Sequence, residues 1–369
     1  MRSLAILTTT AAMTLLGVAN AQQAGAPDAA PQPATGDVAS TSSAPLHDAV
    51  QAYAAYQADI GRLRSVSVAN ADQLESALDT STRHNRDAIS RGWIAYGAMT
   101  AAQSPAFNEG VREAAAYYGR DAVIRGMLID TGWARMLRGG DEATRLVLES
   151  STADAARIGA VANRFQELAY SLQRQRWANA VAPRQSERIQ RVRANGIAPR
   201  HVAGADVGRL IARPMQYTPW TDPTAYGGRR FWDAIGGNSE TVEVSAPASY
   251  TWRLKPERGE AVNRMTTIAA LQALGAAEER PQDVDRLLNE QRSRDCVEMA
   301  QLQLYQCMSA ARFRYENAFC LGSHALAQVG QCINDVAAPG PAPGAQPLSD
   351  AAGAARPGTA EAALAAIQR

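Results

Sequence analysis

The stretch that decides the fold is residues 281–336, PQDVDRLLNEQRSRDCVEMAQLQLYQCMSAARFRYENAFCLGSHALAQVGQCINDV, because it contains all four cysteines of the chain. Cys296 and Cys307 are 11 residues apart, which is almost a whole number of turns at about 3.6 residues per turn. The pair therefore lies on one face of a predicted helix. Cys320 and Cys332 follow with a spacing of 12 residues.

A turn near Arg314 folds this segment back on itself and brings the cysteines together in two pairs. Cys307 then meets Cys320, and Cys296 meets Cys332, because both pairs are centred on almost the same point of the chain. One antiparallel register aligns both pairs, with the two bridges roughly 17 Å apart along the helices. We therefore predict a helical hairpin that is closed by these two disulfides.

The sequence does not fix the geometry of the second helix or the pairing of the cysteines. Cys332 lies about 120° around an ideal helix from Cys320, so the second helix is expected to break before Cys332, at Gly330. Four cysteines also allow three connectivities. The first helix carries apolar residues on several sides, which predicts that it packs against the rest of the protein as well.

A metal site is the alternative use of the four cysteines. Zinc sites usually take close pairs such as C-x2-C, and spacings of 11 and 12 residues do not provide them. His324, four residues after Cys320, is the histidine nearest to such a site. We predict no metal and no cofactor. The layout resembles the twin-cysteine helical hairpins of small oxidised proteins, and this resemblance concerns architecture without implying an activity.

The first 21 residues are typical of a secretory signal peptide. Arg2 supplies the positive end, residues 4–18 form a short apolar run, and residues 19–21 (Ala-Asn-Ala) form a small-x-small cleavage site. No later stretch has 18 consecutive apolar residues, so we expect no transmembrane segment in the mature chain. Export agrees with an even number of cysteines, and the predicted location is periplasmic or secreted after signal-peptide cleavage.

Composition divides the remaining chain and predicts a mainly α fold. Residues 22–45 and 337–369 are rich in Ala, Pro, Gly and Ser and are expected to be a disordered linker and a disordered tail. Residues 46–178 have the pattern of a helical bundle. Residues 179–258 form an irregular middle rich in proline, arginine and aromatic residues, and residues 259–336 contain helices with the cysteine hairpin.

Individual helices follow from capping residues and breakers. Ser104-Pro105 is a helix-start signal, and Gly139-Gly140 is a stop signal. Pro281 is expected to begin the cysteine hairpin. The predicted helices span residues 46–66, 72–102, 105–118, 121–137, 141–177 (with a break near Ser150-Ser151) and 259–274. Strand-like residues 241–244 and 249–254 predict a small β-hairpin in the middle segment.

Charge identifies one candidate binding surface. The chain is balanced overall, with 37 Lys+Arg against 36 Asp+Glu, which argues against a nucleic-acid-binding protein. Residues 174–213 are locally basic, with nine arginines against two acids. Arg188, Arg191 and Arg193 in this flank are the candidate residues for binding an anionic envelope polymer or lipid headgroup. The alternative is that the flank is an ordinary solvated helix face.

The second candidate surface is an aromatic segment that follows this flank. Tyrosine, tryptophan and arginine are the usual anchors of protein interfaces, so the segment is a candidate surface for binding a partner. The alternative is that the rings fix a loop to their own domain. The candidate residues are Tyr217, Trp220, Tyr226, Arg229, Arg230, Phe231 and Trp232.

The sequence contains no recognisable catalytic motif. It has no G-x-S-x-G, no H-E-x-x-H and no glycine-rich phosphate loop, and its four histidines are scattered. Glu149-Ser150 is similar to the Glu-Ser pair of lytic transglycosylases, in which the glutamate is an acid with a raised pKa. The glycine-rich segment of that family is missing, because residues 158–166 read IGAVANRFQ. Catalytic residues therefore stay unknown.

These features predict an exported bacterial cell-envelope protein with a non-catalytic binding or scaffolding role. Its expected partner is an anionic envelope polymer or another envelope protein. The first alternative is an envelope hydrolase or lytic enzyme that acts on cell-wall polymer. The second is a secreted surface component that contacts a partner.

Overall fold

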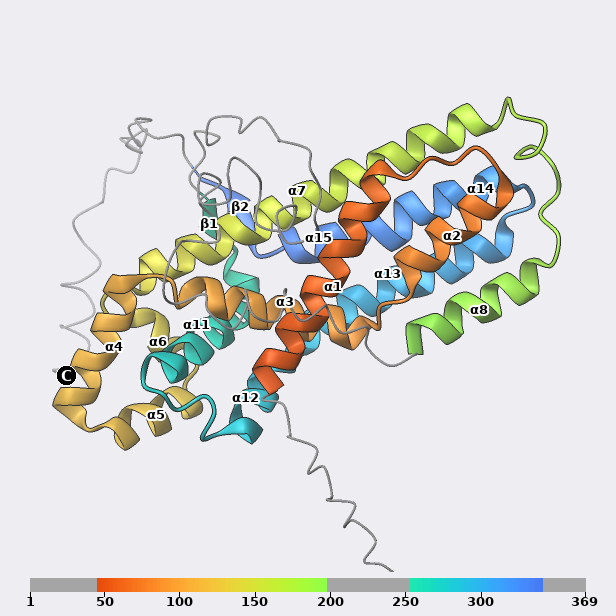
Figure 1. Cartoon of the computed structure of the whole chain (residues 1–369). Helices are drawn as coiled ribbons and strands as arrows, with labels where there is room; N and C mark the ends of the chain where they lie inside the picture. The colour runs from red at the N-terminus through yellow and green to blue at the C-terminus, as the bar shows by residue number, and fades with distance from the viewer. Residues whose placement is uncertain (1–44, 198–251, 341–369) are drawn as a thin grey trace, which may run out of the picture. The chain divides into compact units, whose positions relative to one another are not determined.

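The computed structural model describes residues 45–197 and 252–340, and within them the chain is mainly α-helical, as predicted (Figure 1). A 3-10 turn, η2 (Pro256–Arg258), and a π-helical segment, η3 (Leu321–Gln328), complete the helical elements. The α-helices are α1 (Pro45–Ser65), α2 (Ala71–Thr82), α3 (Arg86–Ala101), α4 (Pro105–Tyr118), α5 (Arg120–Ile129), α6 (Gly132–Met136), α7 (Gly140–Leu172), α8 (Gln185–Ile197), α11 (Gly259–Ala273), α12 (Pro281–Leu288), α13 (Gln291–Ala310), α14 (Arg314–Cys320) and α15 (Val329–Asn334).

Helix α3 is at the centre of the packing, in contact with α1, α7, α11 and α13. Its Trp93 is almost fully buried and donates from its indole N–H to Ser151 Oγ of α7 at 3.2 Å. Helix α1 approaches α3 so closely that a Cβ atom at Gly92 would lie 2.6 Å from the carbonyl oxygen of Ala49. Only glycine fits at this crossing, and both helices are buried over most of their length.

The bundle contains shorter helices than the pattern predicts. The single helix expected over residues 72–102 is wrong, because α2 and α3 are separated by residues 83–85. Asn85 caps α3 by accepting a hydrogen bond from the N–H of Asp87 at 2.7 Å. Residues 121–137 likewise form two helices, α5 and α6.

Other boundaries confirm or correct the pattern. Ser104 caps α4, accepting from the N–H of Phe107 at 3.1 Å, as the Ser-Pro signal predicts. The expected break near Ser150 does not occur, since α7 is continuous there and the Ser150 hydroxyl donates to its own helix, to Val147 O. Pro281 starts only the short helix α12, and the cysteine-bearing α13 begins after it, at Gln291.

The segment predicted as irregular, residues 179–258, contains helix α8, strand β1 (Trp252–Leu254) and the η2 turn. β1 pairs in antiparallel register with β2 (Ala337–Pro339), with Arg253 opposite Ala338. The predicted tail therefore begins with a strand. Residues 1–44, 198–251 and 341–369 lie outside the described part, together with the predicted signal peptide, the 241–244 strand and the aromatic segment at 217–232.

The cysteine segment forms the predicted antiparallel hairpin. Its first arm is α13, its turn is residues 311–313, and its second arm is the continuous run of α14, η3 and α15. The second arm lies against α7, while α13 contacts the second arm, α3 and α8 (Figure 1). We call these four helical elements the stapled hairpin. In the part of the chain that the structure describes, no helix is long and apolar enough to cross a membrane.

Candidate functional site

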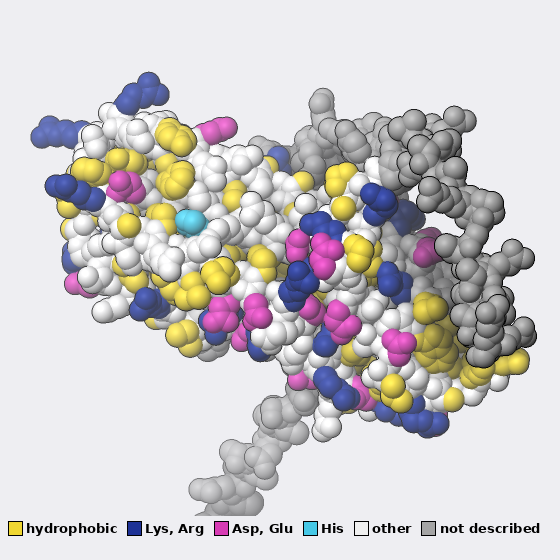
Figure 2. Space-filling view, turned by 180° about the vertical axis from the view of Figure 1, so that it is seen from behind, with side chains coloured by type: hydrophobic (Ala, Val, Ile, Leu, Met, Phe, Trp, Pro, Cys, Tyr) yellow, Lys and Arg dark blue, Asp and Glu magenta, His cyan; other side chains and the backbone are white. Residues whose placement is uncertain are grey.

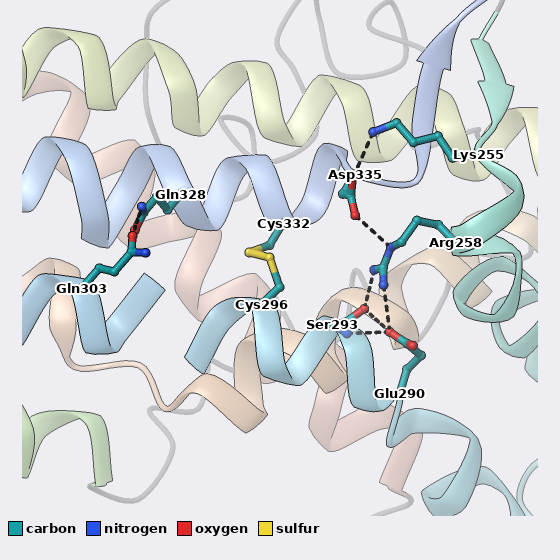
Figure 3. Close-up of a disulfide and its surroundings, with 9 residues drawn as sticks. All are labelled: Lys255, Arg258, Glu290, Ser293, Cys296, Gln303, Gln328, Cys332 and Asp335. Atoms are coloured by element: carbon teal, nitrogen blue, oxygen red, sulfur yellow. Dashed lines mark hydrogen bonds and ion pairs between the residues drawn. A yellow bond between two sulfur atoms is a disulfide. The ribbon is translucent and has the colours of Figure 1, made fainter. Parts of the chain in front are cut away.

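Both predicted disulfides are present in the stapled hairpin. Cys296 bridges Cys332 with a Cα–Cα distance of 5.8 Å, and Cys307 bridges Cys320 at 5.7 Å. Both distances fall within the range of about 4.4–6.8 Å that a bridge requires. The antiparallel register inferred from the cysteine spacing is therefore confirmed, and the outer bridge is drawn in Figure 3.

The π-helical segment η3 explains how Cys320 and Cys332 of the second arm both face α13. An ideal α-helix would place Cys332 about 120° away from Cys320. Hydrogen bonds of the i→i+5 type put additional residues into each turn, and one extra residue shifts the phase by about 100°. Because η3 lies between the two cysteines, they face α13 on the same side without a break. The break expected at Gly330 is wrong, since Gly330 lies inside α15.

The two bridges share an asymmetry in burial. Cys320 and Cys332, on the second arm, are buried, whereas Cys296 and Cys307, on α13, are half-buried. The second arm lies between α7 and α13, which accounts for the difference. Each bridge thus has one sulfur near the surface and one in the core.

A buried arginine closes the hairpin beyond the outer bridge (Figure 3). Arg258, which is 2% exposed, donates to Ser293 Oγ at 2.8 Å and pairs with Glu290 at 3.6 Å and with Asp335 at 3.4 Å. Lys255 also pairs with Asp335, at 2.9 Å. Since a buried guanidinium needs compensating charge, these acids fix Arg258 between the start of α13 and the end of α15. We assign the cluster a structural role.

Glutamine side chains join the two arms between the bridges (Figure 3). The Gln328 amide N–H donates to Gln303 Oε1, which leaves Gln328 Oε1 3.0 Å from His324 Nδ1. With the amide oriented in this way, Nδ1 of His324 is assigned as the donor. This chain of contacts fixes the orientation of the His324 ring.

An apolar cleft opens beside the inner bridge, at the other end of the hairpin. Its volume is about 270 Å³, and it lies between the end of α7, the end of α13 and α14. Tyr170 and Phe319 stand at the cleft with 62% and 39% of their surface exposed. The one carboxylate among the lining side chains is that of Glu316, which accepts from the N–H of Phe313 at 2.8 Å in the hairpin turn. The cleft therefore presents mainly apolar surface.

A smaller cavity of about 40 Å³ lies behind α13, with His84 and His324 in its lining. His84 Nε2 is 2.6 Å from Asp59 Oδ2, and Asp59 also accepts from Arg83 Nε at 2.5 Å and from Arg62 Nε at 2.7 Å. Burial alone would raise the pKa of Asp59, but the hydrogen bonds from His84, Arg83 and Arg62 outweigh it and hold this pKa below its usual range. The ionised carboxylate thus ties the α2–α3 joint to α1.

The volume of this cavity limits what it can hold. A water molecule needs roughly 10–15 Å³ of such space, so about 40 Å³ accommodates only a few waters. Within the described residues, no group of three or more His, Cys, Asp or Glu side chains is placed to hold a metal ion. The cavity therefore offers no basis for a cofactor or substrate.

A second buried polar cluster joins α1 to α7. Tyr53 donates its hydroxyl to Asp154 Oδ2 at 2.8 Å, and Gln57 donates to the Tyr53 hydroxyl at 3.0 Å. Arg157 donates to the backbone oxygen of Gln57 at 2.8 Å. Burial, and then the Asp154 charge, raise the pKa of Tyr53 well above its usual value. The phenol is therefore a permanent donor that positions the two helices.

The three arginines of the predicted cationic surface contact other residues of the protein. Arg188 is buried and pairs with Glu75, and Arg191 Nε pairs with Asp79 at 2.9 Å. Arg193 lies over the Tyr305 ring, with its guanidinium carbon 5.1 Å from the ring centroid. The structure brings these arginines together along α8, but it uses them to hold α8 against α2 and α13. Binding of an anionic polymer here stays a prediction.

The remaining sequence candidates do not assemble into a catalytic group among the described residues. Glu149 pairs with Arg145 at 2.8 Å on the exposed side of α7, and its neighbour Ser150 is buried. His47 lies within hydrogen-bonding distance of Gln51 on α1. No protein-family model, no curated protein and no solved structure matches this chain. The site must therefore be interpreted from its own geometry.

Proposed function

We propose that this is an exported, non-catalytic binding protein whose binding site is the cleft beside the Cys307–Cys320 bridge. The observation that carries the proposal is that two aromatic rings, Tyr170 and Phe319, remain exposed around an apolar cleft on a cross-linked support. A bridge at the cleft wall keeps its shape fixed before binding, which lowers the entropic cost of association.

The dimensions of the cleft favour a protein partner. About 270 Å³ is slightly below the range of ordinary small-molecule pockets, but it accepts one or two large side chains. Aromatic residues at the edge are typical of interface anchors. We therefore expect an apolar segment of another envelope or secreted protein to insert there.

Other roles receive less support from the geometry. An anionic polymer would need free cations, whereas Arg188 and Arg191 are paired with acids of α2. A lytic enzyme would need a desolvated acid, whereas Glu149 is partly exposed and paired with Arg145. A pull-down with cell-wall sacculi and a turbidity assay check both alternatives. Binding or clearing of the sacculi would contradict the proposal.

Export is supported by the signal-like residues 1–21 and by the two disulfides. Mass spectrometry of the mature N-terminus should identify Gln22 as the first residue. Full-length protein with free thiols in the cytoplasm would contradict this part of the proposal.

Site-specific photo-crosslinking tests the cleft itself. We expect p-benzoylphenylalanine in place of Phe319 to crosslink one protein partner in the cells that produce the chain. The matched control places the same probe at Leu302, which is 45% exposed on α13 but outside the cleft. The additional change Tyr170→Ser should abolish the crosslink from position 319. Equal crosslinking from both positions would contradict a specific cleft.

A further inference from the structure

A second exposed apolar surface lies on α4, α5 and α6, on elements that do not line the cleft. Four large hydrophobic side chains there have most of their surface exposed: Tyr117 (80%), Tyr118 (61%), Ile129 (87%) and Met136 (81%). These helices lie at the left in Figure 1. Figure 2 shows the molecule from behind, so the same end lies at the right, where hydrophobic side chains are gathered. We call these four residues, with Trp133, the α4–α6 patch.

Ring contacts join the three aromatic members of the patch, and Ile129 and Met136 lie one helical turn after Gly126 and Trp133 respectively. The Tyr117 and Tyr118 rings meet edge to face with centroids 4.6 Å apart, and Tyr118 meets Trp133 at 6.4 Å. Trp133 in turn lies against α5, since a Cβ atom at Gly126 would be 2.4 Å from its ring. The rings are therefore positioned by their neighbours, and their outer surfaces form one apolar area rather than isolated contacts.

The charges around the patch select the kind of partner. Residues 105–138 contain five arginines and four acids, so their net charge is close to zero. An anionic lipid surface attracts segments with a clear excess of cations, which these helices do not have. Mixed charge of both signs suits a protein surface instead. The whole chain has a formal net charge of +1, so two copies do not repel each other appreciably.

The area of the patch suits a second copy of the same chain. Two tyrosines with these exposures offer roughly 280 Å², and Ile129 and Met136 add roughly 100 Å² each. A symmetric contact uses the patch twice and so buries roughly 1,000 Å², the lower limit for a specific interface. We propose that the protein forms a two-fold symmetric dimer through the α4–α6 patch.

Measurement of mass against concentration tests this dimer. Sedimentation equilibrium of the full mature chain, from about 1 to 100 µM, should show a monomer that converts to a dimer, because an interface of this size is weak. The double variant Ile129→Glu/Met136→Glu should stay monomeric throughout. Both side chains are more than 80% exposed, so its circular dichroism and melting temperature should match those of the wild type.

The matched control is Met299→Glu/Leu302→Glu, which changes two exposed apolar residues on α13 and should leave the dimer intact. A wild-type chain that is monomeric at every concentration would overturn the proposal. So would a dimer that survives in the α5–α6 variant or is lost in the control. Flotation with anionic phospholipid vesicles completes the test, and wild-type binding that the Ile129→Glu/Met136→Glu variant loses would reassign the patch to a membrane surface.

Discussion

Helices α1 and α13 are similar in length, but they are held in the protein by different forces. α1 buries 13 of its 21 residues between α3, α7 and α12, whereas α13 buries only five of its 20. α13 instead carries one cysteine of each disulfide. The comparison teaches that covalent links substitute for burial where only a narrow stripe of a helix is buried.

The largest effect is expected from removal of the disulfides. On the chain-entropy estimate, the inner bridge contributes about 3 kcal/mol and the outer bridge, which joins residues 36 apart, about 4 kcal/mol. After reduction, backbone amides of α13 should exchange with deuterium much faster, while those of α1 and α3 stay protected. Hydrogen exchange followed by mass spectrometry, with and without reductant, measures this. Uniform loss of protection would show that the hairpin and the bundle unfold together.

The next largest effect is expected at Asp59, the buried carboxylate that ties α1 to the α2–α3 joint, whereas α13 is tied to its neighbours by disulfides. Asp59→Asn should lower the free energy of unfolding by about 3–5 kcal/mol at pH 7, because it leaves Arg83 and His84 without their carboxylate. Urea denaturation measures the change. Asp72→Asn, which alters an acid in the first turn of α2, is the control and should have a much smaller effect.

The pH dependence of this difference follows from the lowered pKa of Asp59. A depressed pKa in the folded state adds stability that is complete above the unfolded value of about 3.9 and is lost as the pH falls below it. The stability gap between wild type and Asp59→Asn should therefore be constant near neutral pH and shrink below about pH 4. A gap that widens on acidification would contradict the assignment.

A smaller loss is expected from Tyr53→Phe at the α1–α7 contact. The change removes one hydrogen bond from the buried Asp154 but keeps the ring, so it should cost about 1–3 kcal/mol. Thermal unfolding monitored by circular dichroism measures it. Tyr117→Phe, at an 80% exposed ring, should leave the melting temperature of the monomer unchanged.

The smallest effect is expected at α8, where Arg191→Gln removes the ion pairs of Arg191 with Glu75 and Asp79 at the surface. The Arg191 side chain is 43% exposed, and pairs of this kind contribute less than about 1 kcal/mol each. Urea titrations at low and high salt should give nearly the same result for wild type and variant. A loss of several kcal/mol would mean that α8 depends on these pairs far more than their exposure indicates.

Spacing alone was sufficient to predict the bridges, because cysteine pairing depends on register. Spacing is insufficient for the geometry between the bridges, because such a pattern predicts an ordinary α-helix and η3 is a π-helix. The joint at residues 83–85 was missed for a related reason, since it contains no Gly or Pro. Asn85, a good N-cap residue, was the available signal.

The candidate site was harder to predict than the fold. Tyr170 and Phe319 become neighbours of one cleft only through the packing of α7 on α14, which no local pattern encodes. Arg188 was expected on a surface because its local sequence is basic, but its partner Glu75 is more than 100 residues away in the chain. The amino-acid composition of a segment does not reveal charge pairs with residues that are distant in the sequence.

The uneven burial of the two bridges has a consequence for the route by which they are oxidised. Cys320 and Cys332 are 1% and 5% exposed once the second arm lies on α7, whereas Cys296 and Cys307 on α13 are half-buried. Because thiol–disulfide exchange passes through a mixed disulfide, an oxidising enzyme that meets the docked hairpin has to engage Cys296 or Cys307, and the buried thiol then displaces the enzyme. A reductant likewise meets the α13 sulfur of each bridge first.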